Sequence, residues 1–151
     1  ADGRAMLAAE ALGADGVQVG SRFAVSVESS AHDSFKNRVA SAEEGETILT
    51  LKQLTPVRMI RNRFYQKVEE AEKRGASREE LASILGSRRA KLGIFEGDLE
   101  EGELEIGQVS AAVKRIQPAA EIVREILEEY TRLKESICHG VSQNKGDVSL
   151  R

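Results

Sequence analysis

The chain has 151 residues, of which 40% are hydrophobic and 4% aromatic, and its net charge at pH 7 is −3. This composition suffices for the core of one ordinary domain, while the acidic balance and the scarcity of aromatic rings argue against a nucleic-acid-binding surface. The single cysteine excludes an internal disulfide, and no apolar run reaches the roughly 18 residues of a membrane span. We therefore expect a cytoplasmic protein whose partners include neither nucleic acid nor membrane.

The first 19 residues predict a helix followed by a short strand. Residues 4–12 place apolar side chains at helical spacing, with Asp2 as the N-cap and Gly13 as the stop. In residues 15–19 two valines alternate around Gln18, which is the pattern of a strand. A single strand leaves its backbone groups unpaired, so we expect the chain to be one part of a larger fold.

The next segments predict two helices and a β segment between them. Residues 29–42 repeat apolar side chains at intervals of four, and residues 46–53 favour a strand or an extended loop. A Thr-Pro pair at 55–56 predicts the start of a long helix that ends at Gly75. The expected buried positions of the two helices are Ala31, Phe35, Val39, Val57, Ile60, Phe64, Val68 and Ala71.

Two further helices complete the expected order. Ser77 and Glu80 have the spacing of a capping box, which predicts a helix through Leu85. Pro118 opens a last helix, and residues 136–151 are polar enough to predict a flexible tail. The apolar face of the last helix consists of Ile122, Ile126, Tyr130 and Leu133.

The stretch ADGVQVGSRF, residues 14–23, predicts a strand that ends in Gly20 and Ser21 before a helix begins. Glycine lets the backbone approach a ligand closely, and the exposed amides and the serine hydroxyl are hydrogen-bond donors, so the turn suits an anion. Phosphate sites of (β/α)8 barrels commonly follow the last two strands. On spacing alone, a strand-to-helix turn without a ligand is an equally good interpretation.

The first 23 residues, ADGRAMLAAEALGADGVQVGSRF, resemble the seventh helix and eighth strand of the nitronate monooxygenase family. This family includes the former 2-nitropropane dioxygenases and the flavin-dependent enoyl-acyl-carrier-protein reductase II. The resemblance continues through AHDSFKNRV, PVRMIRNRF and EGDLEEGELEIGQ and covers residues 1–135.

The resemblance implies an α/β fold, the C-terminal portion of a flavin-binding (β/α)8 TIM barrel with a mainly helical extension. We expect residues 1–45 to form the last βα units of the barrel. Residues 46–135 would form the helical extension with a lid-like loop, and residues 136–151 the tail.

The same resemblance implies an FMN site. The segment that matches QVGS would contact the flavin phosphate, and its residues are Gln18, Val19, Gly20 and Ser21. The family's catalytic histidine and its other phosphate-binding glycines would precede Ala1, so we assign no catalytic residue to this chain. We expect a C-terminal fragment that is inactive by itself.

Residues 96–108, EGDLEEGELEIGQ, gather six carboxylates around three glycines. Hard cations prefer carboxylate ligands, but the spacing of a calcium-binding loop is absent, and a solvated loop is the simpler interpretation, so no metal is expected. In the family this region folds over the mouth of the barrel, which makes Gly107 and Gln108 candidates for contact with the flavin or the substrate. The amide of Gln108 suits this role because it can both donate and accept a hydrogen bond.

The remaining polar features favour structural roles. Asp33 follows His32, but neighbours on a helix point in different directions, so the pair does not form a catalytic dyad. His139 and Cys138 fall in the polar tail. The basic runs at 58–67 and 88–91 would suit an acidic carrier protein or a phosphorylated cofactor, yet an ordinary ion-paired surface is the simpler interpretation.

We expect the intact protein to be an FMN-dependent oxidoreductase whose flavin carries the chemistry. It would reduce a 2-enoyl thioester of acyl-carrier protein or coenzyme A with NAD(P)H, or oxidise an alkyl nitronate with O2. The alternative from another class is a non-catalytic helical interaction module without a cofactor. A homo-oligomer that covers the strand edges is compatible with both interpretations.

Overall fold

The structure, a computed structural model, describes residues 2–143, and it describes side chains as far as Cys138. The described residues divide into two compact units, residues 2–19 with 119–143 and Gly20–Pro118. The boundaries predicted at residues 45 and 135 for the barrel portion and its extension stay predictions. The part of the predicted tail that the structure describes continues the last helix.

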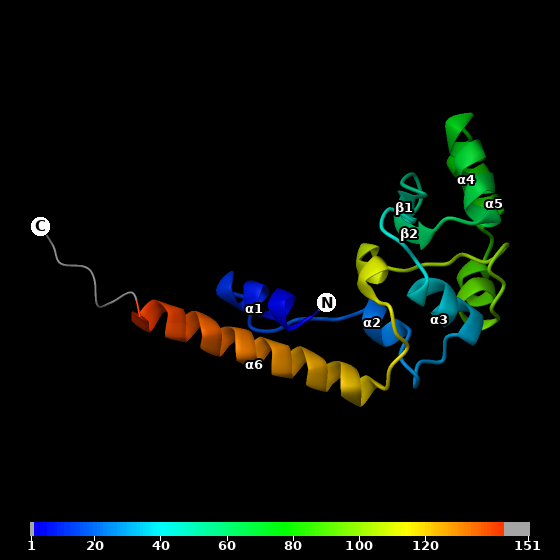
Figure 1. Cartoon of the computed structure of the whole chain (residues 1–151). Helices are drawn as coiled ribbons and strands as arrows, with labels where there is room; N and C mark the ends of the chain where they lie inside the picture. Colours follow the sequence, from blue (N-terminus) through cyan, green and yellow to red (C-terminus); the bar gives the residue numbers. More distant parts are fainter. Residues whose placement is uncertain (1, 144–151) are drawn as a thin grey trace, which may run out of the picture. The chain divides into compact units, whose positions relative to one another are not determined.

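The first unit is a pair of helices, α1 (Gly3–Ala11) and α6 (Ala119–Gln143), which lie side by side (Figure 1). As predicted, Asp2 caps α1, and its Oδ1 accepts a hydrogen bond of 2.8 Å from the amide of Ala5. Gly13 follows the helix with a φ of +94°, the left-handed conformation that glycine adopts readily. The sequence signals for both ends of α1 are therefore confirmed.

The two helices touch at Gly3. A Cβ placed on Gly3 would collide with the backbone of α6 at Tyr130, so only glycine permits this approach. The Gly3 amide donates a hydrogen bond of 2.8 Å to Glu129 Oε2. On the predicted apolar face of α6, Ile122 and Ile126 are buried.

Residues 14–19 do not form the strand that we predicted. They pair with no strand in the described part of the chain, and Val17 is 43% exposed. The alternating valines suit a strand, but a strand is stable only when a neighbour satisfies its backbone groups. The local pattern does not supply that neighbour, which is why the prediction was wrong.

The second unit begins with α2 (Ser21–Ala24) and α3 (Asp33–Ala40), and both pack against the short 3-10 helix η2 (Gln108–Ala112). Helix α3 lies within the predicted range 29–42, and it starts at Asp33 because the side chain of His32 caps it there. The three side chains expected to be buried on this helix face are buried. The shared core consists of Val25, Ala31, Phe35, Val39, Ala42, Ile60, Leu104, Ile106 and Val113.

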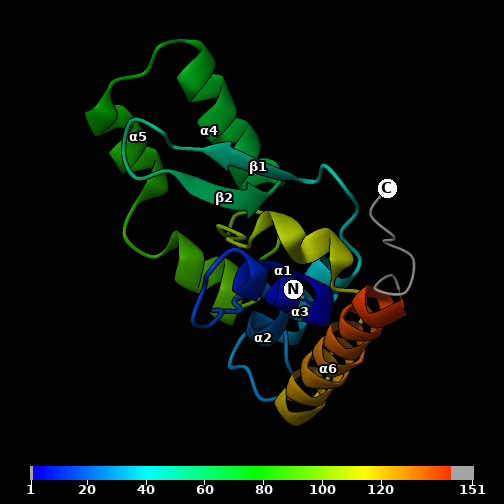
Figure 2. The same cartoon turned by 90° about the vertical axis from the view of Figure 1, so that its left-hand side faces the viewer.

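Two strands, β1 (Thr47–Thr50) and β2 (Val57–Ile60), form an antiparallel pair (Figure 2). Strand β1 confirms the β segment predicted within residues 46–53. Strand β2 corrects a prediction, because its residues were expected to form the first turn of a long helix. The Thr-Pro pair favours the start of a helix, but strand β2 is stabilised by hydrogen bonds on two sides. It pairs with β1, and on its other side the amide of Ile60 donates a hydrogen bond of 3.0 Å to Leu104 O.

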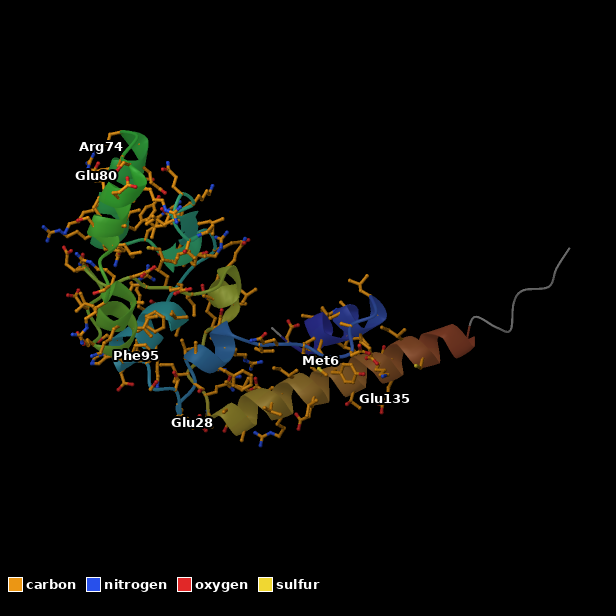
Figure 3. The ribbon with its side chains drawn as sticks, turned by 180° about the vertical axis from the view of Figure 1, so that it is seen from behind. Met6, Glu28, Arg74, Glu80, Phe95 and Glu135 are labelled. Atoms are coloured by element: carbon orange, nitrogen blue, oxygen red, sulfur yellow. The ribbon has the colours of Figure 1, made fainter. Side chains whose placement is uncertain are left out.

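Helices α4 (Arg63–Lys73) and α5 (Arg78–Leu85) follow the hairpin and contribute to the core on one of its faces (Figure 2). Asn62 caps α4, and Ser77 caps α5 as predicted, its Oγ accepting a hydrogen bond of 3.2 Å from the Glu80 amide. The Glu80 carboxylate pairs with Arg74 at the turn between the two helices (Figure 3). This core consists of Leu51, Met59, Phe64, Tyr65 and Val68, with Ile48, Leu54, Val57, Ile84 and Leu85 against it.

The glutamate-rich loop, residues 96–108, is held by hydrogen bonds from Asn62 and by close packing at Gly102. Asn62 Nδ2 donates hydrogen bonds of 2.8 Å to Leu99 O and to Gly102 O. Gly102 lies against the backbone of Gly93, which belongs to the π-helix η1 (Lys91–Phe95), so a side chain at either glycine would collide with the backbone facing it. These contacts fix the backbone at Leu99 and Gly102, ahead of Gly107 in the chain.

Candidate functional site

Helix α2 starts at a glycine with open space around it. Gly20 O accepts hydrogen bonds from the amides of Phe23 and Ala24 at 3.0 and 2.9 Å, which begins the helix. The φ of Gly20 is −98°, a value open to any residue, and a Cβ added there would meet no atom within 4 Å. Neither the backbone conformation nor packing against the described residues requires glycine at this position.

Ser21 lies directly beside Gly107. Ser21 is only 9% exposed, and a Cβ built on Gly107 would lie 2.7 Å from Ser21 Oγ, closer than such atoms approach in folded proteins. Glycine at 107 therefore leaves room for the hydroxyl. The structure thus brings together one residue from the predicted phosphate turn and one from the predicted substrate-side loop.

The other predicted site residues lie next to these two in sequence. Gln18 is exposed and Val19 is half-buried, and both belong to the first unit, whereas Gly20 begins the second. Gln108 is exposed and opens η2 directly after Gly107. Assignment of these residues to a cofactor or substrate stays a prediction.

Helix α2 is held in place by a glutamine that the sequence analysis missed. Arg22 Nη2 donates to Gln117 Oε1 at 3.2 Å, and the Val27 amide donates to Gln117 O at 3.0 Å. Gln117 is 7% exposed, so these bonds are sheltered from water. Apolar periodicity carries no signal for a buried glutamine, and only its position before Pro118 marks it.

A second missed residue is Ser110 in η2. Its amide donates to Gly107 O at 3.0 Å, and its side chain is fully buried. Within the described residues, its Oγ is the buried side-chain polar atom that lacks a hydrogen-bond partner. In the sequence, the only feature that marks Ser110 is its position three residues after Gly107.

His32 has a structural role. Its Nδ1 accepts a hydrogen bond of 3.1 Å from the Ser34 amide and caps α3, and its ring packs on Gly97. The His32 amide donates to Ile94 O at 2.7 Å. These contacts match the structural role that we expected.

Within residues 96–108, Glu96 and Glu101 form ion pairs with basic side chains of the protein itself. Glu101 lies 2.6 Å from Lys67, 3.4 Å from Arg63 and 3.5 Å from Arg89. The hydrogen bond from Lys67 is the main cause that lowers the pKa of Glu101. Among the described residues no group of three or more His, Cys, Asp or Glu side chains is arranged to hold a metal ion.

Glu103 differs from the other glutamates of this loop because it is buried. Burial raises the pKa of its carboxyl above the usual 4.5, and the neighbouring charge of Glu105 raises it further. The group thus favours its neutral form more than an exposed glutamate does.

The basic runs are largely engaged in ion pairs and hydrogen bonds. Lys91 and Arg88 lie 3.2 and 4.0 Å from Glu96. Arg58 lies on a strand rather than on the predicted helix face, and its guanidinium donates to Thr47 Oγ1 at 3.2 Å. These partners support the interpretation as an ordinary protein surface.

The last two candidates lie near the end of the described chain. Cys138 is exposed on α6, and the side chain of His139 lies outside the described residues. Within residues 2–143 no helix has both the length and the apolar character needed to cross a membrane.

Comparison with known proteins identifies the family. The family model of nitronate monooxygenase matches residues 1–129. A probable nitronate monooxygenase of Staphylococcus saprophyticus is 39% identical over 71 residues, which cover 46% of this chain and 20% of the relative. A probable nitronate monooxygenase of Staphylococcus aureus is 29% identical over 138 residues, covering 89% of this chain and 38% of the relative. The chain belongs to the nitronate monooxygenase family, a family of oxidoreductases.

Two solved structures resemble the chain over most of its length. FabK from Thermotoga maritima matches with a TM-score of 0.83 and 35% identity, covering 92% of this chain and 44% of FabK. Nitroalkane oxidase from Streptomyces ansochromogenes matches with a TM-score of 0.70 and 27% identity, covering 90% of this chain and 38% of that protein. Both neighbours are TIM-barrel proteins, and the chain spans less than half the length of each.

Proposed function

We propose that this chain supplies part of the FMN site of a flavin-dependent oxidoreductase. Membership in the nitronate monooxygenase family supports the reaction class, because enzymes of this family generally use FMN. The observation that carries the proposal is the contact between Ser21 and Gly107. It joins the two segments that the family resemblance assigns to the cofactor and to the substrate side.

The residues present fit a phosphate. The open space beside Gly20 lets an oxygen approach the backbone, and the hydroxyl of Ser21 is a hydrogen-bond donor. Gln18 and Val19 precede this turn and complete the segment that would contact the phosphate. Bound FMN would supply the electron transfer, and the chain would anchor and orient it.

The substrate side of the proposal rests on Gln108. Its exposed amide can donate a hydrogen bond to the oxygen of a carbonyl or nitro group. The greater likeness to FabK than to nitroalkane oxidase favours NAD(P)H-dependent reduction of a 2-enoyl thioester, with the carrier protein or coenzyme A as the thiol. Oxidation of an alkyl nitronate with O2 is the second candidate, supported by the names of the curated relatives.

Substitution of Gly20 by valine tests the phosphate assignment. A Cβ at this position would meet none of the described atoms within 4 Å, so the fold should persist, but the valine side chain would fill the space that the phosphate needs. We expect FMN affinity to fall roughly tenfold or more, as loss of hydrogen bonds to a charged group predicts. The measurement is a titration followed by flavin fluorescence.

Gly16→Val is the matched control, because Gly16 also has open space around it and lies outside the proposed site. It should leave FMN affinity unchanged. Wild-type affinity in Gly20→Val, with the control behaving as expected, would rule out the phosphate assignment.

A further inference from the structure

Glu103 is a carboxyl group buried without a compensating charge. It is 6% exposed, and no hydrogen bond or ion pair joins its carboxyl to another of the described residues. The charge that acts on it is that of Glu105, which is also negative. An ionised carboxylate is costly in such a place, so the fold favours the neutral acid.

The charged side chains on the elements around Glu103 are engaged by other partners. The basic ones are Arg63, Lys67 and Arg89 with Glu101, Arg88 and Lys91 with Glu96, Arg61 with Glu69, and Arg58 with Thr47. In the same loop, Asp98 accepts the amides of Glu100 and Glu101. Within the described part of the chain, an ionised Glu103 would therefore gain a neutralising partner only if one of these pairs rearranged.

Residues 103–106 lie along strand β2 as a third strand would. The amide of Ile60 donates to Leu104 O, and the amide of Ile106 donates to Arg58 O, both at 3.0 Å. Leu104 and Ile106 are buried in the core shared with α3. The attachment of this segment therefore consists of two backbone hydrogen bonds and two buried apolar side chains, with a buried carboxyl at its start.

From these observations we infer that residues 103–106 form a pH-sensitive attachment to strand β2, which loosens when Glu103 ionises. Detachment would bring the carboxylate into water and remove the cost of its burial. The next residues are Gly107 and Gln108, the two substrate-side candidates, so the pH would control how firmly the chain holds them. The inference concerns the chain without a ligand and does not rest on the proposed function.

Amide hydrogen exchange, followed by NMR on the 151-residue chain, tests the attachment. The amides of Ile60 and Ile106 report on it because each donates a hydrogen bond across it. Burial raises the pKa of Glu103 above 4.5, so the attached state is favoured at low pH and loses this advantage as the pH rises. After correction for the intrinsic pH dependence of exchange, we expect the protection of both amides to fall about threefold or more between about pH 5 and pH 7.5.

Glu103→Gln removes the charge and keeps the size of the side chain. In this variant the protection of Ile60 and Ile106 should not depend on pH. Glu44→Gln is the matched control, because Glu44 is exposed in the loop before β1, and it should keep the pH dependence of the wild type. A pH dependence that persists in Glu103→Gln would overturn the inference.

Helix α4 supplies the reference for unfolding of the whole unit. Val68 lies in the middle of this helix and is fully buried. We expect Ile60 and Ile106 to be less protected than the Val68 amide, because the attachment opens before the unit unfolds. Equal protection of all three amides would show that residues 103–106 open only when the unit unfolds, and the inference would be wrong.

Discussion

At the scale of single residues, Glu103 is a buried carboxyl group whose environment opposes its negative charge. It is 6% exposed, and the pKa of its carboxyl is raised by burial and by the charge of Glu105. A raised pKa means that the folded chain holds this proton more tightly than the unfolded chain. As pH rises from the unfolded value near 4.5 through the folded value, the free energy of unfolding contributed by this group falls.

Glu103→Gln removes this titration. We expect the variant to gain stability relative to the wild type as pH rises from about 4.5 to 7, because the neutral amide needs no ionisation in the buried site. Urea unfolding midpoints measured at several pH values check this. Glu105→Gln should give a smaller change of the same sign, and a stability difference that does not depend on pH would contradict the prediction.

Sequence reasoning named candidate residues by their type and spacing, and it missed residues whose environment depends on folding. The strand-to-helix turn singled out Ser21 and the family resemblance singled out Gly107, but neither indicated that the two residues are in contact. Ser110 and Gln117 stand out only because their polar side chains are buried, and burial depends on the residues that pack around them. Neither spacing nor residue type reveals such an environment in advance.

At the scale of elements, the residues that begin and end helices were predictable from the sequence. The choice between helix and strand was predicted wrongly for some segments. As expected, Ser77 caps the start of α5 and Gly75 follows the end of α4, because capping depends on a few neighbouring residues. Residues 57–60 became strand β2 because partners on both sides satisfy their backbone. Those partners lie elsewhere in the sequence, so local propensity misjudged the segment.

The contact between η1 and the glutamate-rich loop depends on paired glycines, which gives a prediction at this scale. In Gly102→Ala the new methyl group would collide with the backbone of Gly93, and backbone yields less readily than a side chain. We expect a loss of about 2 kcal/mol in the free energy of unfolding, in the range of overpacked interiors, measured by urea titration.

Gly20→Ala is the comparison, because its methyl group would meet nothing within 4 Å and the backbone there has a φ of −98°. Its stability should stay within about 0.5 kcal/mol of the wild type. If both variants are equally stable, the glycine contact does not hold the loop.

At the scale of the whole molecule, the described chain consists of two units with separate packing. The first joins residues close to one end of the sequence with a helix close to the other, and the second is the continuous segment Gly20–Pro118. Gly3 of α1 lies directly against the backbone of α6, with no room for a side chain. A change there should therefore affect one unit more than the other.

Gly3→Ala tests whether the two units unfold independently. The methyl group would meet the backbone of α6 at Tyr130, so α1 and α6 should lose amide protection in hydrogen exchange, while α3 and α4 keep theirs. Gly16→Ala, with open space around the methyl group, should leave both units unchanged. Equal loss of protection in α3 and α4 would show that the two units unfold together.

The sequence by itself determined the family, through a resemblance along most of the chain, and most helix ends, because capping depends on residue types at short spacing. The tertiary structure decided that residues 57–60 form a strand, that residues 14–19 do not, and that Ser21 meets Gly107. It also decided that the hydroxyl of Ser110 is buried without a hydrogen-bond partner among the described residues. Each of these depends on contacts between residues far apart in the chain, and backbone pairing and burial have no local signature.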